Sequence, residues 1–299
     1  MKAWINGHFV DAADAKIGFF DAGFQHGIGL FETMLARDGA VLRLEAHLER
    51  LAASARELRL FDPLHIEPLA EAVQVTLSKN EMKDARVRVT LTAGDMGRPF
   101  AGANVVGEKP AAPQPTVTVH VQPPTRYPDE LFANGVGVTI AENRANPHDP
   151  YSGHKTLMYW PRISAVQRAA ELGCAEALWF TITNHLASGS VSNVFLAKGG
   201  ALCTPFARGE EPAGADPRIV TRAPVLPGCT RAAAILWAEG TGIAVSRAHL
   251  TIDDVLAADE IFLTNSSWGV LPVVRVERHQ VGDGKPGPIA RAMREKWLA

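Results

Sequence analysis

The sequence has 299 residues and a formal net charge of −2, and 46% of its residues are hydrophobic and 21% charged. Such values are typical of a soluble folded enzyme, and a chain of this length is expected to form two domains. The balanced charge offers no electrostatic surface for nucleic acid or an anionic membrane, and no apolar run is long enough to span a bilayer. Three cysteines without paired spacing indicate a reducing compartment, the cytoplasm, and ten histidines without ligand spacing argue against a metal site.

The first part of the chain combines hairpin signals with helical periodicity. Asn6-Gly7 and Asp38-Gly39 are turn signals, each flanked by short apolar runs. The expected elements are a hairpin at 3–10, a second hairpin from strands 29–36 and 41–44, helices at 45–58 and 66–77, and strands at 87–92 and 116–121. Residues 102–115 are rich in Ala, Pro and Gly, which predicts an exposed loop.

A proline-rich segment at 122–128 predicts a linker, because prolines stiffen it and no periodicity crosses it. We therefore expect a small N-terminal domain at 1–121, a linker at 122–133 and a larger domain at 134–299. The expected elements beyond the linker are strands at 136–142, 177–182, 194–197, 260–264 and 271–276, and helices at 161–172 and 231–238. This order predicts an α+β protein. The charged, Pro-rich and Gly-rich segment 206–224 is expected to be a mobile loop or lid.

Lys155 ends a turn-rich segment and precedes a helical stretch. The small-residue loop 187–193 follows it, and then Val225-Leu-Pro-Gly-Cys-Thr-Arg231, which leads into a helix. A lysine amine can form a Schiff base, and a helix N-terminus can bind phosphate. An isolated lysine is usually a surface residue, but the three features in this order predict a site for a phosphate-bearing aldehyde cofactor.

The motif His47-x-x-Arg50-Leu51-x-x-Ser54 places four side chains on one face of the predicted helix. One interpretation is a surface stripe in which Arg50 pairs with a nearby glutamate. The other makes Arg50 a ligand for phosphate, since its guanidinium matches phosphate geometry. Both interpretations stay open at this point.

Three further polar positions each have a structural and a functional interpretation. Thr230 can cap the helix that it begins and still contribute to an anion site with the backbone amides there. The segment Asn265-Ser266-Ser267 is either an ordinary turn or a source of hydroxyls for the same phosphate. Arg98 follows a glycine-containing loop and is either a solvated arginine or a clamp for a substrate carboxylate.

These motifs together resemble the class IV aminotransferase family, the fold-type IV pyridoxal-phosphate enzymes. The family includes branched-chain aminotransferases, D-amino-acid aminotransferases and aminodeoxychorismate lyases. The resemblance runs nearly end to end, through residues 20–34, 47–54, 154–155, 189–195, 226–231, 258–264 and 271–273. It implies a homodimer in which each chain has a small N-terminal α/β domain and a larger C-terminal domain with a β-barrel-like core.

The resemblance also implies pyridoxal 5′-phosphate as cofactor and a role for particular residues. These are Lys155 for the Schiff base, Arg50, Cys229, Thr230 and Ser266 for the phosphate, Leu226 for the ring face, and Phe31 and Arg98 for the substrate.

One position departs from the family pattern. Where the family has a glutamate that pairs with the pyridine nitrogen, an ungapped alignment to Gly189-Ser-Val-Ser-Asn193 places Ser188. Ser188 is therefore expected to face that nitrogen. A hydroxyl lacks the charge of a carboxylate, so the ring is expected to be a weaker electron sink. The 206–224 loop is a second departure and leaves the substrate class open.

The favoured activity is amino transfer between an amino acid or amine and a 2-keto acid, which proceeds through the Lys155 Schiff base. One alternative is a lyase of the aminodeoxychorismate type that releases pyruvate, in which Lys155 serves as acid and base. A second alternative, from a different class, is a cofactor-binding protein with little catalysis.

Overall fold

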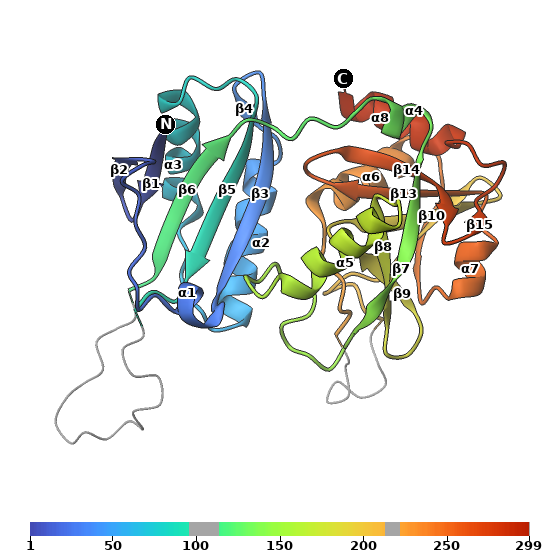
Figure 1. The fold of residues 1–299 in the computed structure, drawn as a ribbon, viewed down its shortest axis with the longest axis horizontal. Helices are drawn as coiled ribbons and strands as arrows, with labels where there is room; N and C mark the ends of the chain where they lie inside the picture. The colour runs from blue at the N-terminus through green and yellow to red at the C-terminus, as the bar shows by residue number, and fades with distance from the viewer. Residues whose placement is uncertain (96–113, 213–221, 299) are drawn as a thin grey trace. The chain divides into compact units, whose positions relative to one another are not determined.

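The structure is a computed structural model that describes residues 1–95, 114–212 and 222–298. Contacts divide the chain into two compact units, each with its own sheet and helices (Figure 1). The first unit contains Met1–Thr125 and Lys155–Met158, and the second contains Arg126–His154 and Tyr159–Ala299. The mixture of helices and largely antiparallel strands confirms the α+β prediction. The assignment of the short Lys155 segment to the first unit was not anticipated.

The first unit is an antiparallel sheet covered on one face by two helices. Its elements are β1 (Lys2–Ile5), β2 (His8–Asp11), α1 (Ala22–His26), β3 (Gly29–Arg37), β4 (Ala40–Val41), α2 (Leu44–Glu57), α3 (Ile66–Lys79), β5 (Ala85–Thr92) and β6 (Thr116–Gln122). The strand order is β2-β1-β6-β5-β3-β4. Apolar side chains of β3, β5 and β6, such as Leu30, Val89 and Val119, pack in one core with Leu51 of α2 and Val73 of α3. Alternate residues of the strands therefore lie on the other face of the sheet.

The second unit is a mixed sheet that curls on itself, with helices around it. Its elements are α4 (Glu130–Ala133), β7 (Val136–Ala145), α5 (Trp160–Glu171), β8 (Glu176–Thr181), β9 (Leu186–Gly189), β10 (Asn193–Lys198), β11 (Ala201–Pro205), α6 (Cys229–Gly240), β12 (Val245–Ala248), α7 (Ile252–Leu256), β13 (Glu260–Asn265), β14 (Gly269–Val276), β15 (His279–Gln280) and α8 (Pro288–Leu298). The strand order is β12-β11-β10-β13-β14-β7-β8-β9. Because β9 also contacts β10 and β11, the sheet curls into a half-barrel. This confirms the β-barrel-like core that the family resemblance predicted for the larger domain.

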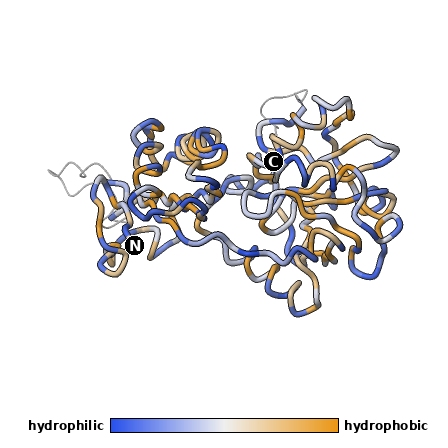
Figure 2. The backbone as a smooth tube through the Cα atoms, turned by 90° about the horizontal axis from the view of Figure 1, so that it is seen from above, coloured by the Kyte–Doolittle hydropathy of each residue, from blue (hydrophilic) through white to orange (hydrophobic). Residues whose placement is uncertain are grey.

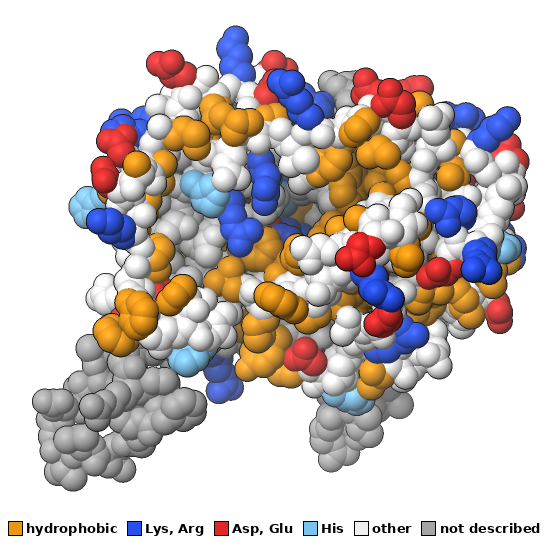
Figure 3. All heavy atoms as spheres, viewed as in Figure 1, with side chains coloured by type: hydrophobic (Ala, Val, Ile, Leu, Met, Phe, Trp, Pro, Cys, Tyr) orange, Lys and Arg blue, Asp and Glu red, His pale blue; other side chains and the backbone are white. Residues whose placement is uncertain are grey.

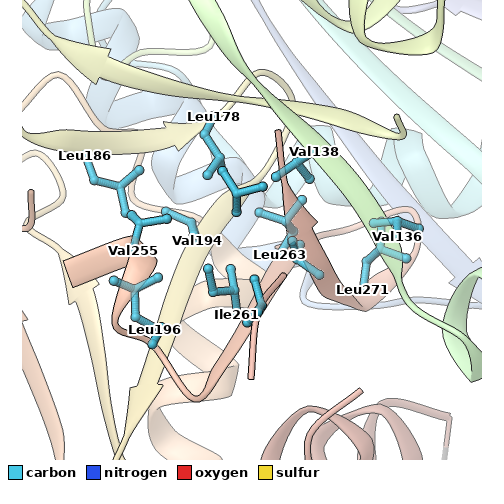
Figure 4. Packing of buried hydrophobic residues seen from close by; sticks show 14 of the residues in the cluster. Val136, Val138, Leu178, Leu186, Val194, Leu196, Val255, Ile261, Leu263 and Leu271 are labelled. Carbon is cyan, nitrogen blue, oxygen red and sulfur yellow. The ribbon is translucent and has the colours of Figure 1, made fainter. Parts of the chain in front are cut away.

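The concave side of this half-barrel is filled by aliphatic side chains. Figure 4 shows Val138, Leu178, Val194 and Leu263 from four strands pointing toward one another. In Figure 2 the hydrophobic segments of the second unit, drawn in orange, gather in its interior strands, whereas hydrophilic segments run along its outer loops. Strands buried on both faces are continuous apolar runs, and Glu176–Thr181 is buried along its whole length.

The observed elements differ from the predicted ones at a few places. The strand expected at 41–44 ends at Val41, because Arg43 has a φ of 55° and α2 begins at the next residue. The helix expected at 231–238 begins two residues earlier, at Cys229. Most of the loop expected at 102–115, together with Arg98 and the middle of segment 206–224, lies outside the described residues. In the described chain, each helix is too short or too polar to cross a membrane.

Candidate active site

Lys155 lies on a short extended segment that pairs with β3 in the first unit. The backbone N–H of Phe31 donates to the Lys155 carbonyl at 2.9 Å, and the N–H of Leu157 donates to the Gly29 carbonyl at 2.9 Å. A Cβ at Gly29 would lie 2.6 Å from the Leu91 carbonyl oxygen as well as 2.6 Å from the Leu157 Cδ1, and because backbone cannot move aside, this close approach requires glycine. The Lys155 Nζ lies 4.5 Å from the centroid of the Phe31 ring. Both backbone bonds fix the backbone of the Lys155 segment against β3.

A second cation lies against the same ring. The Arg88 guanidinium carbon is 3.9 Å from the Phe31 centroid, and Arg88 pairs with His120 across the sheet. Burial, together with the charges of Arg88 and Arg86, lowers the pKa of His120, which keeps this imidazole neutral near pH 7. Figure 3 shows Lys and Arg side chains and a histidine gathered on this face. Sequence reasoning missed Arg88; the available signal was the alternation of Arg86 and Arg88 in the predicted strand.

The helix-facing side of β3 carries a buried ion pair. Glu32 Oε1 accepts from Arg50 Nε at 2.8 Å, and Glu32 Oε2 accepts from Arg50 Nη2 at 2.6 Å. His47 Nδ1 lies 2.7 Å from Glu32 Oε2, and only 1% of each of these two side chains is exposed. Burial by itself would raise the pKa of Glu32, but the Arg50 charge and the hydrogen bonds from His47 and Arg50 lower it to about 2. We refer to Glu32, His47 and Arg50 as the Glu32 cluster.

The Glu32 cluster confirms one part of the first interpretation of the 47–54 motif and contradicts another part of it. Arg50 does pair with a glutamate, as the first interpretation states. The same interpretation is wrong about a surface stripe, because His47, Leu51 and Ser54 are buried. Burial lowers the pKa of His47 despite the Glu32 charge, so His47 is neutral and its Nδ1 donates to the carboxylate. A phosphate role for Arg50 stays a prediction.

In the second unit, the small-residue loop after β9 is organised by a buried carboxylate. Glu176 Oε1 accepts from the backbone N–H groups of Ala177 and Ser190, and its Oε2 accepts from the Val191 N–H and the Ser192 hydroxyl. Burial raises the pKa of Glu176 despite these bonds. In the sequence, Glu176 stands at the start of an apolar run. An acidic residue in such a position is usually a buried carboxylate whose oxygens accept hydrogen bonds.

Ser188, at the end of β9, is buried and lies beside a cation. Arg162, in the first turn of α5, donates from Nη1 to the Ser188 hydroxyl oxygen at 3.3 Å and to the carbonyls of Gly189 and Ser190 at 3.0 and 3.1 Å. Its guanidinium carbon lies 4.9 Å from the ring centroid of Trp179, whose indole N–H donates to the Ser190 hydroxyl. We refer to Ser188, Arg162 and Trp179 as the Ser188 cluster. No motif in the sequence singles out Arg162.

The turn that begins α6 packs against the small-residue loop. The Asn193 amide donates to the Leu226 carbonyl at 2.9 Å, and an added Cβ at Gly228 would lie 2.0 Å from Asn193 Oδ1. Gly228 is therefore required at the N-cap, where it offers no side-chain cap. Thr230 lies inside the helix rather than at its cap, so the capping interpretation of Thr230 is wrong.

Two threonine hydroxyls near this turn are buried without hydrogen-bond partners among the described residues: Thr230 Oγ1 and Thr264 Oγ1. Thr264 pairs with Asn193 in the sheet, and the Asn193 amide bonds to the turn that precedes Thr230. Both hydroxyls therefore belong to segments that contact Asn193. Cys229 is buried in the first helical turn, and Leu226 is half-buried. Buried hydroxyls without partners are costly, which indicates that a polar ligand satisfies them.

The segment after β13 forms a turn, as one of its two interpretations states. Asn265 Oδ1 accepts from the backbone N–H groups of Ser267 and Trp268, and the Asn265 amide donates to the Val191 carbonyl. Ser266 is half-buried at the tip of this turn. In the described part of the chain, no three His, Cys, Asp or Glu side chains gather as a metal site.

Comparison with known proteins shows the family to which these residues belong. The sequence profile described as Amino-transferase class IV matches residues 29–276. Because this match covers most of the chain, the protein belongs to the class IV aminotransferase family, whose members are pyridoxal-phosphate-dependent enzymes.

Individual relatives include both aminotransferases and a lyase. A protein assigned as a branched-chain-amino-acid aminotransferase, from Methanocaldococcus jannaschii, is 30% identical over 99% of this chain and 95% of its own. The structure of the branched-chain amino acid aminotransferase of Escherichia coli matches with a TM-score of 0.86 and 26% identity, over 99% of this chain and 93% of that one. The structure of 4-amino-4-deoxychorismate lyase from Pseudomonas aeruginosa has a TM-score of 0.82 and 26% identity, and the match covers 98% and 97%. The fold-type IV prediction is thereby confirmed.

The residues of the second unit fit the phosphate of pyridoxal 5′-phosphate. The start of α6 presents first-turn amides that lack intrahelical acceptors, and the positive end of the helix dipole favours an anion. The unpartnered hydroxyl of Thr230 lies in this same turn. A phosphate supplies acceptors for both kinds of donor.

Proposed function

We propose that this protein transfers an amino group between an amino acid or amine and a 2-keto acid, with Lys155 as the residue that binds the cofactor covalently. The observation that carries the proposal is the arrangement on the sheet of the first unit. The Lys155 amine and the Arg88 guanidinium lie against one ring, that of Phe31, at 4.5 and 3.9 Å. An exchangeable amine beside a cation suited to carboxylate is what an α-amino acid substrate requires.

Each residue has a definable task in this reaction. When bound, pyridoxal 5′-phosphate supplies an electron-withdrawing ring that acidifies the α-carbon of an attached amino acid. Lys155 would bind the cofactor through Nζ, and once the substrate amine takes its place, Nζ would move the proton of the substrate α-carbon to the cofactor. The bound cofactor would keep the amino group when water releases the keto product, and a 2-keto acid would then take that amino group up. The backbone bonds between the Lys155 segment and β3 fix the backbone from which this side chain extends, which supports the assignment.

The phosphate role is proposed for the start of α6 together with Ser266 and Arg50. The buried, unpartnered Thr230 hydroxyl supports this assignment. Arg50 is already bonded to both oxygens of Glu32, so we propose that it contributes charge and position to the phosphate from within this pair. Leu226, half-buried at the turn, is proposed to contact the ring face.

Several assignments rest on sequence and family alone. We propose that the protein acts as a homodimer in the cytoplasm on small-molecule amino donors and keto-acid acceptors, without nucleic acid or membrane partners. The described cysteines are free thiols, which is consistent with a reducing compartment.

Replacement of Lys155 tests the central assignment. Lys155→Ala should remove any cofactor–lysine adduct that borohydride can trap and should lower transamination at least about a thousandfold, because nucleophile and proton carrier are lost together. Lys198→Ala, at an exposed lysine, is the matched control and should change neither. A trapped adduct in Lys155→Ala would show that another lysine binds the cofactor.

Replacement of Arg88 tests carboxylate recognition. Arg88→Met should raise KM for α-amino acids roughly tenfold to a hundredfold, since a charge-assisted hydrogen bond is worth about 1.5–3 kcal/mol. Amines without a carboxylate should be little affected, and Arg86→Met should serve as control. Equal losses for both substrate types would make Arg88 structural and leave Arg98 as the clamp.

One observation favours the lyase as second candidate: a cation, Arg162, lies beside the Ser188 hydroxyl. We expect Ser188 at the position where the family has a carboxylate, and a weaker electron sink suits elimination better than fast reversible transamination. Release of pyruvate from a chorismate-derived amine would support the lyase, whereas loss of the cofactor absorbance band with simple amino donors supports transfer. A spectrum that no amine changes would indicate a protein that binds the cofactor without catalysis.

A further inference from the structure

Arg162 is a cation without an anionic partner among the described residues. Its Nη1 bonds to two carbonyls and one hydroxyl, and its plane lies near Trp179. Within the described part of the chain, no carboxylate lies at ion-pair distance from it. Neutral oxygens hold a guanidinium in place but leave its net positive charge uncancelled. The charge therefore acts on any group that binds against Ser188.

The Ser188 hydroxyl has a donor that no described residue uses. Its oxygen accepts from Arg162, but none of the described residues accepts its hydroxyl proton. The side chain is buried, with only 4% of the residue exposed, so water does not readily satisfy this donor. A hydroxyl that already accepts from a cation is polarised toward donating its own proton. The Ser188 cluster thus presents a donor, beside a positive charge, to a ligand that offers an acceptor.

We propose that Arg162 is a positioning residue that turns the Ser188 hydroxyl into a donor and keeps the pyridine nitrogen facing it unprotonated. This inference rests on the proposed function and on the expectation from the sequence that Ser188 faces the ring nitrogen of pyridoxal 5′-phosphate. An unprotonated nitrogen accepts the Ser188 proton and adds no charge beside Arg162. A protonated nitrogen would instead place a second cation there and leave the hydroxyl donor unused.

The size of the effect follows from the charge. A cation two hydrogen bonds away, at about 6 Å, changes a protonation equilibrium roughly tenfold to a hundredfold at the effective dielectric constant of a partly buried site. This is large enough to move the nitrogen from mostly protonated to mostly unprotonated across neutral pH. With Arg162 present, the ring nitrogen needs a hydrogen-bond donor rather than a carboxylate, and a serine supplies that donor.

The test measures the protonation of the nitrogen directly. Protein reconstituted with ¹⁵N-labelled pyridoxal 5′-phosphate is titrated from about pH 6 to about pH 9, and the ¹⁵N chemical shift reports the ring nitrogen. The wild type should show an unprotonated nitrogen throughout. Arg162→Met should favour protonation by roughly tenfold to a hundredfold. Arg162→Lys keeps the charge but not the three-acceptor geometry, so it should retain the wild-type shift if charge is the cause.

A matched control lies on the same helix. Arg168 pairs with Glu142 at the surface, with 63% of its side chain exposed, so Arg168→Met should leave the nitrogen unchanged. A protonated nitrogen in the wild type at neutral pH overturns the inference, and it does so even if Arg162→Met fails to fold. Wild-type behaviour in Arg162→Met also overturns it. Borohydride trapping separates the two levels: no adduct at Lys155 overturns the proposed function and this inference together, whereas an adduct with a protonated nitrogen overturns only the inference.

Discussion

Arg50 in the first unit and Arg162 in the second both hold a short polar segment in place, but they differ in what balances their charge. Arg50 donates to both oxygens of Glu32, at 2.8 and 2.6 Å, and the carboxylate is 1% exposed. Arg162 donates to two carbonyls and the Ser188 hydroxyl. The charge of Arg50 is therefore balanced by a carboxylate of the fold even where Arg50 also serves the cofactor phosphate, as proposed above, whereas no described carboxylate balances the charge of Arg162.

The difference shows how the same residue type serves stability in one place and chemistry in another. When a buried ion pair loses one partner, the other charge stays buried without compensation, which destabilises the fold strongly. An arginine held by neutral oxygens costs less to alter, but its removal changes the electrostatics of what it faces. Substitutions in the Glu32 cluster should therefore lower the free energy of unfolding strongly. Substitutions in the Ser188 cluster should change the protonation and reactivity of a bound cofactor.

The largest expected effect breaks the Glu32 cluster. Glu32→Gln should lower the free energy of unfolding by about 3–5 kcal/mol, because Arg50 is left without its carboxylate in a buried position. Chemical denaturation measures this. The surface pair Arg168–Glu142 supplies the control, since Glu142→Gln should cost less than about 1 kcal/mol. Equal, small losses in both variants would mean that the cluster is not stabilising.

The pH dependence of unfolding sharpens the same point. The pKa of Glu32 is lowered from 4.5 to about 2, which corresponds to about 3 kcal/mol at neutral pH. This stability is fully present above the unfolded-state pKa and is lost as pH falls through the folded-state pKa, so the loss falls between about pH 5 and about pH 2. Glu32→Gln should lack this part of the acid dependence. An unchanged acid profile in the variant would contradict the lowered pKa.

A second substitution makes the Ser188 cluster resemble the Glu32 cluster. Ser188→Glu places a carboxylate beside Arg162 and should increase protonation of a bound pyridine nitrogen and speed the transamination half-reaction about tenfold. Ser188→Gln, of equal size without charge, should do neither. Stopped-flow measurement of the cofactor absorbance with an amino donor decides between them. The gain is limited by the desolvation of the new carboxylate if Arg162 does not pair with it fully.

The smallest expected effect concerns Thr230, whose hydroxyl has no partner among the described residues. Thr230→Val should change the free energy of unfolding of the cofactor-free protein by less than about 1 kcal/mol but should weaken cofactor binding roughly tenfold. Thr204→Val is the opposite case, because the Thr204 hydroxyl donates to the Val194 carbonyl at 2.8 Å and accepts from Arg231. Its loss should cost about 1–3 kcal/mol of stability. Cofactor titration and thermal unfolding of both variants make the comparison.

Elements with clear periodicity were predictable from the sequence. The strand expected at 116–121 is observed as Thr116–Gln122, and the helix expected at 66–77 as Ile66–Lys79. The short strands Leu186–Gly189 and Ala201–Pro205 were not predicted, because strands of this length carry too few alternations and depend on their neighbours for hydrogen bonds. The helix Pro288–Leu298 was also missed, although it has an amphipathic pattern.

The sequence by itself determined the family, the cofactor and the motifs that carry the chemistry, because a lysine, a small-residue loop and a Pro-Gly helix start are local features. The partners of these residues depended on tertiary structure. Glu32 reaches Arg50 across a strand and a helix, and Asn193 joins two turns through its amide. Arg162 reaches Ser188 from 26 residues earlier in the chain. Contacts of this kind depend on how strands and helices pack, and no short-range pattern encodes which distant charge will lie beside a given hydroxyl.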